Sequence, residues 1–267
     1  MSYLKRFKND LINYWDYAKY SARAELKAEV AGSYLNGIWW VLEPICLMFI
    51  YAFIFGFIFN AREEYFTAFI FVGLAVWTSF FQQNLKQSVK MVKKQKAILS
   101  KVYVPKFVFI ISKMCVNGFK MCISFLIVIG LMIFYRVPLS WNVIFAPLIL
   151  IAVIIFTFGC MTILLHFGVY VQDLTNVVNI ALRLVFYMTG IMFSIEHRLG
   201  DSHPQIAFLL GKCNPLAFFI TSLRKCLLYS QTPDLYVLGI WFVIGIALSV
   251  IGIITIYRNE NSYIKVV

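Results

Sequence analysis

Charge is what this sequence has least of, and negative charge is scarcest. Only 13% of its 267 residues are charged, and 12 acidic residues stand against 24 Lys and Arg. A soluble domain of this length needs more polar surface than that. The sequence also lacks a phosphate-binding GxxxxGK motif followed by Ser or Thr, an HExxH motif and a GxSxG motif. These absences exclude a soluble globular protein and leave no recognisable catalytic motif.

Long apolar runs take the place of charge. Hydrophobic residues make up 61% of the chain, and several runs reach the roughly 20 residues that a helix needs to cross a bilayer. We therefore predict an all-α integral membrane protein with six transmembrane helices in one domain, residues 35–267. The predicted spans cover about residues 38–59, 65–85, 107–135, 143–167, 177–195 and 235–257.

Seven lysines lie between residues 86 and 106, in the segment that separates the second and third predicted spans. Charges this dense cannot lie in hydrocarbon, and short Lys-rich loops are retained in the cytoplasm. This orientation places both chain ends in the cytoplasm and accounts for the net charge of +12 without a nucleic-acid partner. The segment also offers a docking surface for a soluble partner, with these candidate residues: Lys90, Lys93, Lys94 and Lys96.

Two further segments lack the continuous apolar run that a membrane span requires. Residues 5–30 show helical periodicity with aromatic and basic residues, which predicts an amphipathic helix in the membrane interface within an N-terminal region, residues 1–34. Residues 196–234 contain apolar pieces too short to cross, which predicts re-entrant or interfacial helices on the outer side. Asn214-Pro215 is a helix-start signal there. The outer-gate candidates are Asn214, Pro215, Phe218, Phe219 and Arg224.

Ionisable side chains inside the predicted spans are candidates for a substrate pathway. Such a group is costly unless it is paired, lies near the headgroups or faces a water-filled path. For Glu43 a structural role at the interface and a gating or subunit contact both stay open. For Lys120 snorkelling to the surface and lining a pathway both stay open. The pathway candidates are the ionisable residues Glu43, Lys120 and Arg183 together with three aromatic residues near the ends of predicted spans, Trp40, Trp77 and Phe81.

The six cysteines fall mostly inside apolar runs and have no CxxC spacing, so we interpret them as small core residues. A bridge between Cys213 and Cys226 is the one disulfide that the predicted topology permits. A group of His and carboxylate residues, namely Glu196, His197, Asp201 and His203, has metal-ligand chemistry. We favour solvated side chains over a metal site there.

This chain has membrane spans but no catalytic motif. If it moves a substrate against a gradient, the energy must come from a partner or from an ion gradient. Ion-coupled carriers usually contain inverted repeats, and residues 1–135 and 136–267 show none. A partner ATPase fits better. The chain resembles the membrane subunit of type 2 ABC exporters, in the branch that exports lipid-linked polysaccharides, O-antigens, capsules and teichoic acids. The matching pieces are GSYLNGIWWVLEP, FVGLAVWTSFFQQNL, ILSKVYVPK and NPLAFFITSLRKCLL, in this order.

The resemblance implies a homodimer in the bacterial cytoplasmic membrane with two copies of an ATP-binding subunit, which would hold ATP and Mg²⁺; this chain would hold no cofactor. The Lys-rich segment would contain the coupling helix, residues 196–234 would form gate helices, and aromatic residues would line a glycan channel. Gln172-Asp173 departs from the Arg-Asp expected at the turn between the fourth and fifth spans.

Two mechanistic hypotheses and two alternatives follow from this comparison. Lys120 and Arg183 are expected to meet the phosphate of a lipid-linked substrate. Reversal of Lys93, Lys94 and Lys96 is expected to uncouple ATP hydrolysis from transport. The first alternative is a permease for drugs or simple lipids. The second is a membrane-embedded transferase that acts on a lipid carrier through the residues between Glu196 and His203. Which polymer would be moved stays open.

Overall fold

The computed structural model describes residues 3–32, 34–58, 63–99, 101–200 and 203–266, and these residues form helices and turns with no strand among them. Five helical segments are long and apolar enough to cross a bilayer: Trp39–Phe57, Phe66–Val89, Lys106–Phe134, Trp141–Tyr170 and Leu235–Tyr263. The predicted all-α integral membrane class is confirmed. Each of these five segments overlaps a predicted span.

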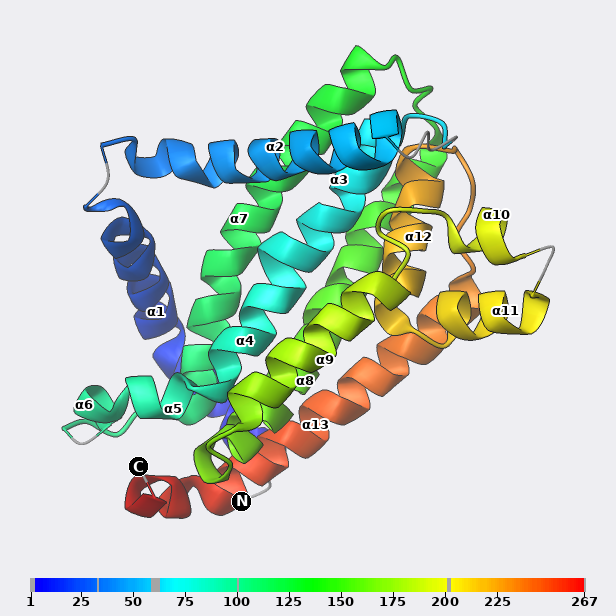
Figure 1. Cartoon of the computed structure of the whole chain (residues 1–267). Coiled ribbons are helices and arrows are strands. Elements are labelled where there is room, and N and C mark those ends of the chain that lie inside the picture. Colours follow the sequence, from blue (N-terminus) through cyan, green and yellow to red (C-terminus); the bar gives the residue numbers. More distant parts are fainter. Residues whose placement is uncertain (1–2, 33, 59–62, 100, 201–202, 267) are drawn as a thin grey trace.

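The bundle is built from helical elements of very different lengths (Figure 1). The first half contains α1 (Tyr3–Val30), η1 (Asn36–Ile38), α2 (Trp39–Tyr51), η2 (Ala52–Ile58), α3 (Phe66–Val76), η3 (Trp77–Gln82), α4 (Gln83–Val89), α5 (Met91–Lys94), α6 (Lys96–Leu99) and α7 (Lys106–Phe134). The second half contains η4 (Trp141–Ile144), α8 (Phe145–Tyr170), α9 (Leu174–Met188), α10 (Ile195–Leu199), α11 (Pro204–Lys212), α12 (Pro215–Leu227) and α13 (Leu235–Val266). The η2 and η3 segments are π-helical turns, so α2–η2 and α3–η3–α4 are continuous helices with wide turns inside them.

The segment α3–η3–α4 forms the centre of the bundle, and α7, α8 and α12 pack around it. Every residue of α3 from Ala68 to Val76 is buried. The helices α8 and α13 approach closely, because a Cβ atom on Gly159 would lie 2.7 Å from Cβ of Leu248. Small residues at helix crossings permit such approach in membrane proteins. The core therefore depends on one buried helix and one tight helix pair.

The fifth predicted span, residues 177–195, is wrong in its extent. The helix α9 ends at Met188 after 15 residues, about 22 Å at 1.5 Å per residue, which is shorter than the hydrocarbon core. The chain turns at Gly190, whose φ of +65° glycine adopts without strain. The Arg224 side chain donates to the carbonyl oxygens of Gly190 and Ile191 and holds this turn in place.

The segment of residues 196–234, predicted to form re-entrant or interfacial helices, contains a bent helix pair. The helices α11 and α12 form a bent pair with an angle of 89° between them, the geometry of a broken or re-entrant span. Asn214 caps α12, since its side chain accepts hydrogen bonds from the backbone N–H groups of Leu216 and Ala217, and Pro215 occupies the first turn. The predicted helix start is confirmed.

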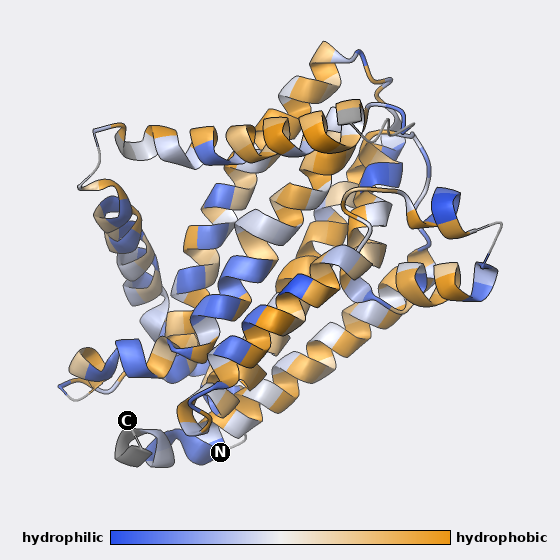
Figure 2. Ribbon diagram, in the orientation of Figure 1, coloured by the Kyte–Doolittle hydropathy of each residue, from blue (hydrophilic) through white to orange (hydrophobic). Residues whose placement is uncertain are grey.

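Both chain ends and the short helices α5 and α6 lie at one end of the bundle, and α10 and α11 lie at the other (Figure 1). The last helix continues beyond the predicted limit of residue 257 to Val266, so it extends past the bundle at the end that holds α5. Hydropathy colouring shows apolar residues along the length of the long helices and polar residues concentrated near α1, α5 and the C-terminal turns (Figure 2).

Candidate functional site

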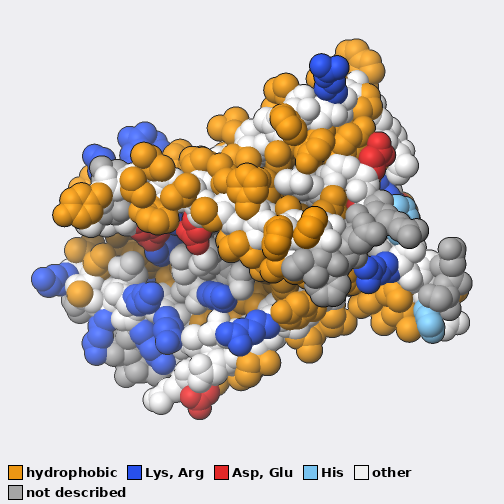
Figure 3. Space-filling view, turned by 45° about the horizontal axis from the view of Figure 1, so that its top comes forward, with side chains coloured by type: hydrophobic (Ala, Val, Ile, Leu, Met, Phe, Trp, Pro, Cys, Tyr) orange, Lys and Arg blue, Asp and Glu red, His pale blue; other side chains and the backbone are white. Residues whose placement is uncertain are grey.

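The first candidate site is the Lys-rich surface formed by α5 and α6. Met91 and Val92 are buried against the bundle, which holds α5 in place. The lysines predicted as docking residues, Lys90, Lys93, Lys94 and Lys96, are all exposed. Figure 3 shows Lys and Arg side chains gathered toward this end of the molecule, whereas apolar side chains cover much of the rest of that view. One buried face and one basic face make α5 suitable as a rigid docking element.

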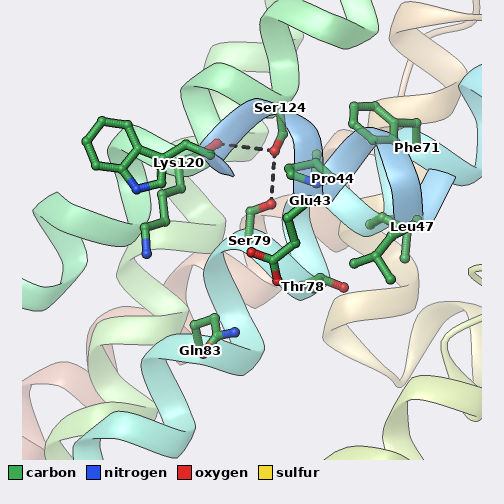
Figure 4. Close-up of a pocket in the computed structure, with 12 residues that line it drawn as sticks. Glu43, Pro44, Leu47, Phe71, Thr78, Ser79, Gln83, Lys120 and Ser124 are labelled. Atoms are coloured by element: carbon green, nitrogen blue, oxygen red, sulfur yellow. Dashed lines mark hydrogen bonds between the residues drawn. The ribbon is translucent and has the colours of Figure 1, made fainter. Parts of the chain in front are cut away.

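The second candidate site is a pocket between α2, α3–η3 and α7 (Figure 4). It contains three of the predicted pathway residues, Trp40, Glu43 and Lys120, and its polar walls include hydroxyl groups from η3 and α7. The volume is about 80 Å³, which is below the range of small-molecule sites. The pocket as folded admits water or a single functional group and is too small for a sugar ring.

Within this pocket, two serines form a hydrogen-bonded chain and the two charges stay apart. The hydroxyl groups of Ser79 and Ser124 lie 2.9 Å apart, and Ser124 also donates to the carbonyl oxygen of Lys120. The Glu43 carboxylate lies beside Thr78 and Ser79, away from the Lys120 amine (Figure 4). The two open interpretations of Glu43 therefore stay open, because it reaches a polar pocket without pairing there.

Two ion pairs connect α1 to α7. Lys113 pairs with Glu25, and the Lys120 amine lies 2.8 Å from Glu29 Oε2 and 3.0 Å from Oε1. Sequence reasoning missed both carboxylates. Their signal is the spacing, since Glu25 and Glu29 are four residues apart on one helix face and the two lysines are seven apart on another. The Lys120 charge is compensated within the chain, so its role as a phosphate contact stays a prediction.

The other three predicted pathway residues lie elsewhere. The Trp77 ring is fully buried and packs 5.4 Å from the Phe81 ring and 5.8 Å from the Phe186 ring. Phe81 is buried too, so neither side chain reaches a surface of the single chain. Arg183 is exposed on α9, and the structure does not bring it to the pocket that holds Lys120.

In the outer segment, Arg224 is the least expected finding. It is 3% exposed, and its guanidinium donates to the carbonyl oxygens of Phe69, Gly190 and Ile191 at 2.7–3.0 Å. The same group lies over the Phe69 ring. Phe218 and Phe219 of α12 are buried as well. The predicted gate helix therefore packs into the bundle in this state, and its role as a gate stays a prediction.

Beside Arg224 lies a charged cavity of about 400 Å³, within the size range of small-molecule sites. Two contacts cross it: Lys225 pairs with Glu196 at 2.8 Å, and His197 Nδ1 lies within hydrogen-bond distance of Glu63 Oε2, at 3.0 Å. Tyr229 also lines it, and burial together with Glu63 raises the pKa of that phenol to about 12. Two of the side chains that sequence analysis considered for catalysis or metal binding, Glu196 and His197, are therefore engaged by neighbouring side chains.

No group of three metal-type ligands occurs among the residues that the structure describes, and Asp201 lies outside them. His203 comes directly before α11 and is exposed. The six thiols are free, so the Cys213–Cys226 bridge that the topology permitted is not formed; Cys213 is exposed and Cys226 is buried.

The arrangement of several long apolar helices, joined by short connections and a bent helix pair, is that of a multi-pass membrane protein. The chain belongs to the ABC-2 type transporter family, whose signature matches residues 19–228.

Three curated proteins illustrate the relationship. Two proteins of Klebsiella pneumoniae, each named O-antigen export system permease protein RfbA, are 30% and 26% identical to this chain over 86% of both lengths. A protein of the same name from Myxococcus xanthus is 26% identical over 79% of both lengths. The resemblance drawn from the sequence is thereby confirmed.

Proposed function

We propose that this chain is the permease subunit of an ATP-driven exporter that moves a lipid-linked polysaccharide across the bacterial cytoplasmic membrane. Membership in the ABC-2 type transporter family and the names of its relatives support the transport role. The observation that carries the energy-coupling part is α5, whose buried Met91 and Val92 anchor an exposed row of lysines. Such a face fits a soluble subunit that hydrolyses ATP for the membrane subunit.

The assembly that we propose contains two copies of this chain and two copies of the ATP-binding subunit. Apolar side chains remain exposed on η2 and α9, among them Phe53, Phe57, Ile180 and Tyr187 at 59–79%. Either lipid or a second copy can cover such surfaces. A paired arrangement would enclose a conduit that no single bundle offers, because Trp77 and Phe81 fill the centre of this one.

The orientation that we propose places α5, α6 and both chain ends in the cytoplasm. The lysines of residues 86–106 support it through the positive-inside rule. The outer re-entrant pair α11 and α12 then faces the opposite side. The transferase alternative loses support, because Glu196 pairs with Lys225 and His197 forms a hydrogen bond with Glu63.

The docking surface is tested with the double variant Lys93→Glu and Lys94→Glu in the complex with its ATPase subunit. We expect transport of lipid-linked glycan into vesicles to fall about tenfold while ATP hydrolysis persists, because reversed rim charges weaken a steered contact. The matched control reverses Arg136 and Arg198, which are exposed basic residues outside the docking segment. Its ratio of transport to hydrolysis should stay at the wild-type value.

Each result has a distinct meaning. Normal coupling in the Lys93/Lys94 variant would refute the docking assignment alone. A wild-type complex that moves drugs or simple lipids but no lipid-linked glycan would replace the proposed substrate with the first alternative.

A further inference from the structure

Three segments far apart in the sequence meet at the end of the bundle that holds both termini. Arg6 belongs to α1, Tyr103 lies between α6 and α7, and Glu260 lies near the end of α13. The Arg6 Nη2 atom lies 2.7 Å from Glu260 Oε1 and 2.6 Å from the Tyr103 hydroxyl oxygen. The Tyr103 hydroxyl donates to Glu260 Oε2 at 2.9 Å. These three side chains close a ring, which we call the end junction.

A second layer of aromatic side chains lies beside the end junction. The Phe107 ring of α7 is 4.7 Å from the Phe7 ring and 6.0 Å from the Tyr257 ring. Tyr257 in turn donates to Asp10 at 2.7 Å and lies under the Arg6 guanidinium at 4.6 Å. The aromatic contacts therefore join α1, α7 and α13, and the end junction adds the segment that precedes α7.

The chemistry of the end junction favours a rigid contact. Both Glu260 oxygens are occupied, and the residue is 9% exposed, so water competes little for this carboxylate. Burial and the neighbouring Glu260 raise the pKa of Tyr103 to about 12, so its hydroxyl keeps the proton that it donates. The Arg6 pKa is raised as well, with hydrogen bonds to Glu260 and Tyr103 outweighing the desolvation that lowers it.

The position of Tyr103 connects the end junction to the docking helices. Tyr103 follows the docking helices α5 and α6 and precedes Pro105, the residue before α7. The backbone N–H groups of Lys101 and Val102 donate to the carbonyl oxygen of Ile98, so the segment that holds Tyr103 is tied to α6. At its other end Pro105 leads directly into α7, and between them the Tyr103 hydroxyl contacts Arg6 of α1 and Glu260 of α13.

We infer that the end junction of Arg6, Tyr103 and Glu260 transmits movement of the docking surface to α1 and α13, and so sets how much transport each hydrolysed ATP produces. This inference rests on the proposed function, because it needs the ATPase partner. The three side chains are positioning residues, because the role that we infer for them acts through the helices that they join.

The test is a charge swap in the complex with the ATPase subunit. We expect Arg6→Glu alone and Glu260→Arg alone each to lower the ratio of transported glycan to hydrolysed ATP about tenfold. The double variant restores a pair of opposite charges and should recover most of the ratio. Tyr103→Phe removes one hydroxyl group that two partners share, so its loss should be smaller, about threefold.

The matched control is the charge swap Asp16→Lys with Lys19→Asp. These two residues form an exposed pair on the same helix, with 2.8 Å between Lys19 Nζ and Asp16 Oδ1. The swap should leave both the ratio and the melting temperature unchanged. The melting temperature of every variant is measured in parallel, so that lost folding is separated from lost coupling.

Two results would overturn the inference. Single variants that lower the melting temperature but keep the wild-type ratio would make the end junction a structural tie only. A double variant that recovers nothing would show that the Arg6–Glu260 contact does not carry the effect. Failure of the proposed function would look different, because the wild-type complex itself would then show no ATP-dependent glycan transport.

Discussion

The helices α2–η2 and α3–η3–α4 follow each other in the chain and have opposite environments. Both contain windows that are apolar enough to cross a bilayer, yet 6% of the α2–η2 window is buried and 67% of the α3–η3–α4 window is. The exposed helix is also the more hydrophobic of the two. In a soluble protein the more hydrophobic helix would be the buried one.

The bilayer reverses that expectation because lipid accepts apolar side chains and rejects polar ones. Two polar side chains of the central helix, Asn84 and Ser88, are fully buried and make hydrogen bonds inside the bundle: Asn84 Oδ1 accepts from Asn117, and the Ser88 hydroxyl donates to the Leu85 carbonyl oxygen. The exposed faces of α2–η2 carry aromatic and aliphatic side chains such as Phe49 and Phe53. Polarity within an apolar run is therefore the better sign of a central helix here.

The largest expected effect comes from Arg224, whose guanidinium ties α12 to the carbonyl oxygen of Phe69 on α3. Arg224→Met should lower the free energy of unfolding by about 3 kcal/mol or more, because three buried carbonyl oxygens lose a charged donor. Thermal unfolding in detergent measures this. The control Lys225→Met removes only a partly exposed ion pair and should cost less than about 1 kcal/mol. Equal losses would mean that Arg224 is not a buried tie.

An intermediate effect is expected at the polar centre of the α4–α7 contact. Asn117 Nδ2 donates to Asn84 Oδ1 at 2.9 Å, and both residues are fully buried. Asn117→Leu should destabilise the protein by about 1–2 kcal/mol, because Asn84 is left without its partner. The double variant Asn84→Leu with Asn117→Leu should recover part of that loss. An additive double loss would argue that the two amides do not form this bond.

The smallest effect is expected on α2–η2. Phe53 is 59% exposed, so Phe53→Ala should change the free energy of unfolding of the single chain by less than about 0.5 kcal/mol. If a second copy covers this face, as we propose, the same substitution lowers the yield of crosslinked dimer. Phe53→Leu is the control that keeps an apolar side chain. A loss of several kcal/mol in the single chain would mean that α2–η2 packs against the bundle.

The sequence predicts much of this architecture for simple reasons. Hydropathy locates five long helices because a span must satisfy its backbone internally and cover itself with apolar groups. The start of α12 depends on local chemistry and can be predicted from Asn214-Pro215 alone. The end of α9 also depends in part on a local signal, because Gly190 favours a turn. The predicted span still extends too far, because the residues that follow Gly190 are apolar.

The candidate sites were less predictable because they depend on contacts between distant segments. Lys120 stood out in the sequence, but its partner Glu29 lies 91 residues away on α1. Trp77 and Phe81 were chosen as aromatic residues near one end of a span, and only the fold shows that they are buried. Arg224 was named as an outer-gate candidate because it lies in the helix predicted to start at Asn214-Pro215. Only the fold shows that its guanidinium is buried against three backbone carbonyl oxygens.

The π-helical turn of η3, Trp77–Gln82, has a consequence for how this protein tolerates changes in length. A π-turn holds one residue more than an α-turn, so the helix can shed or regain a residue there by switching between the two. An indel at that place would be absorbed within one turn. The same indel in the middle of α8 would rotate everything after it by about 100°, since each residue advances the helix by that angle. The middle of the most buried helix is thus a place where the chain can gain or lose a residue without turning the rest of the helix to a different face.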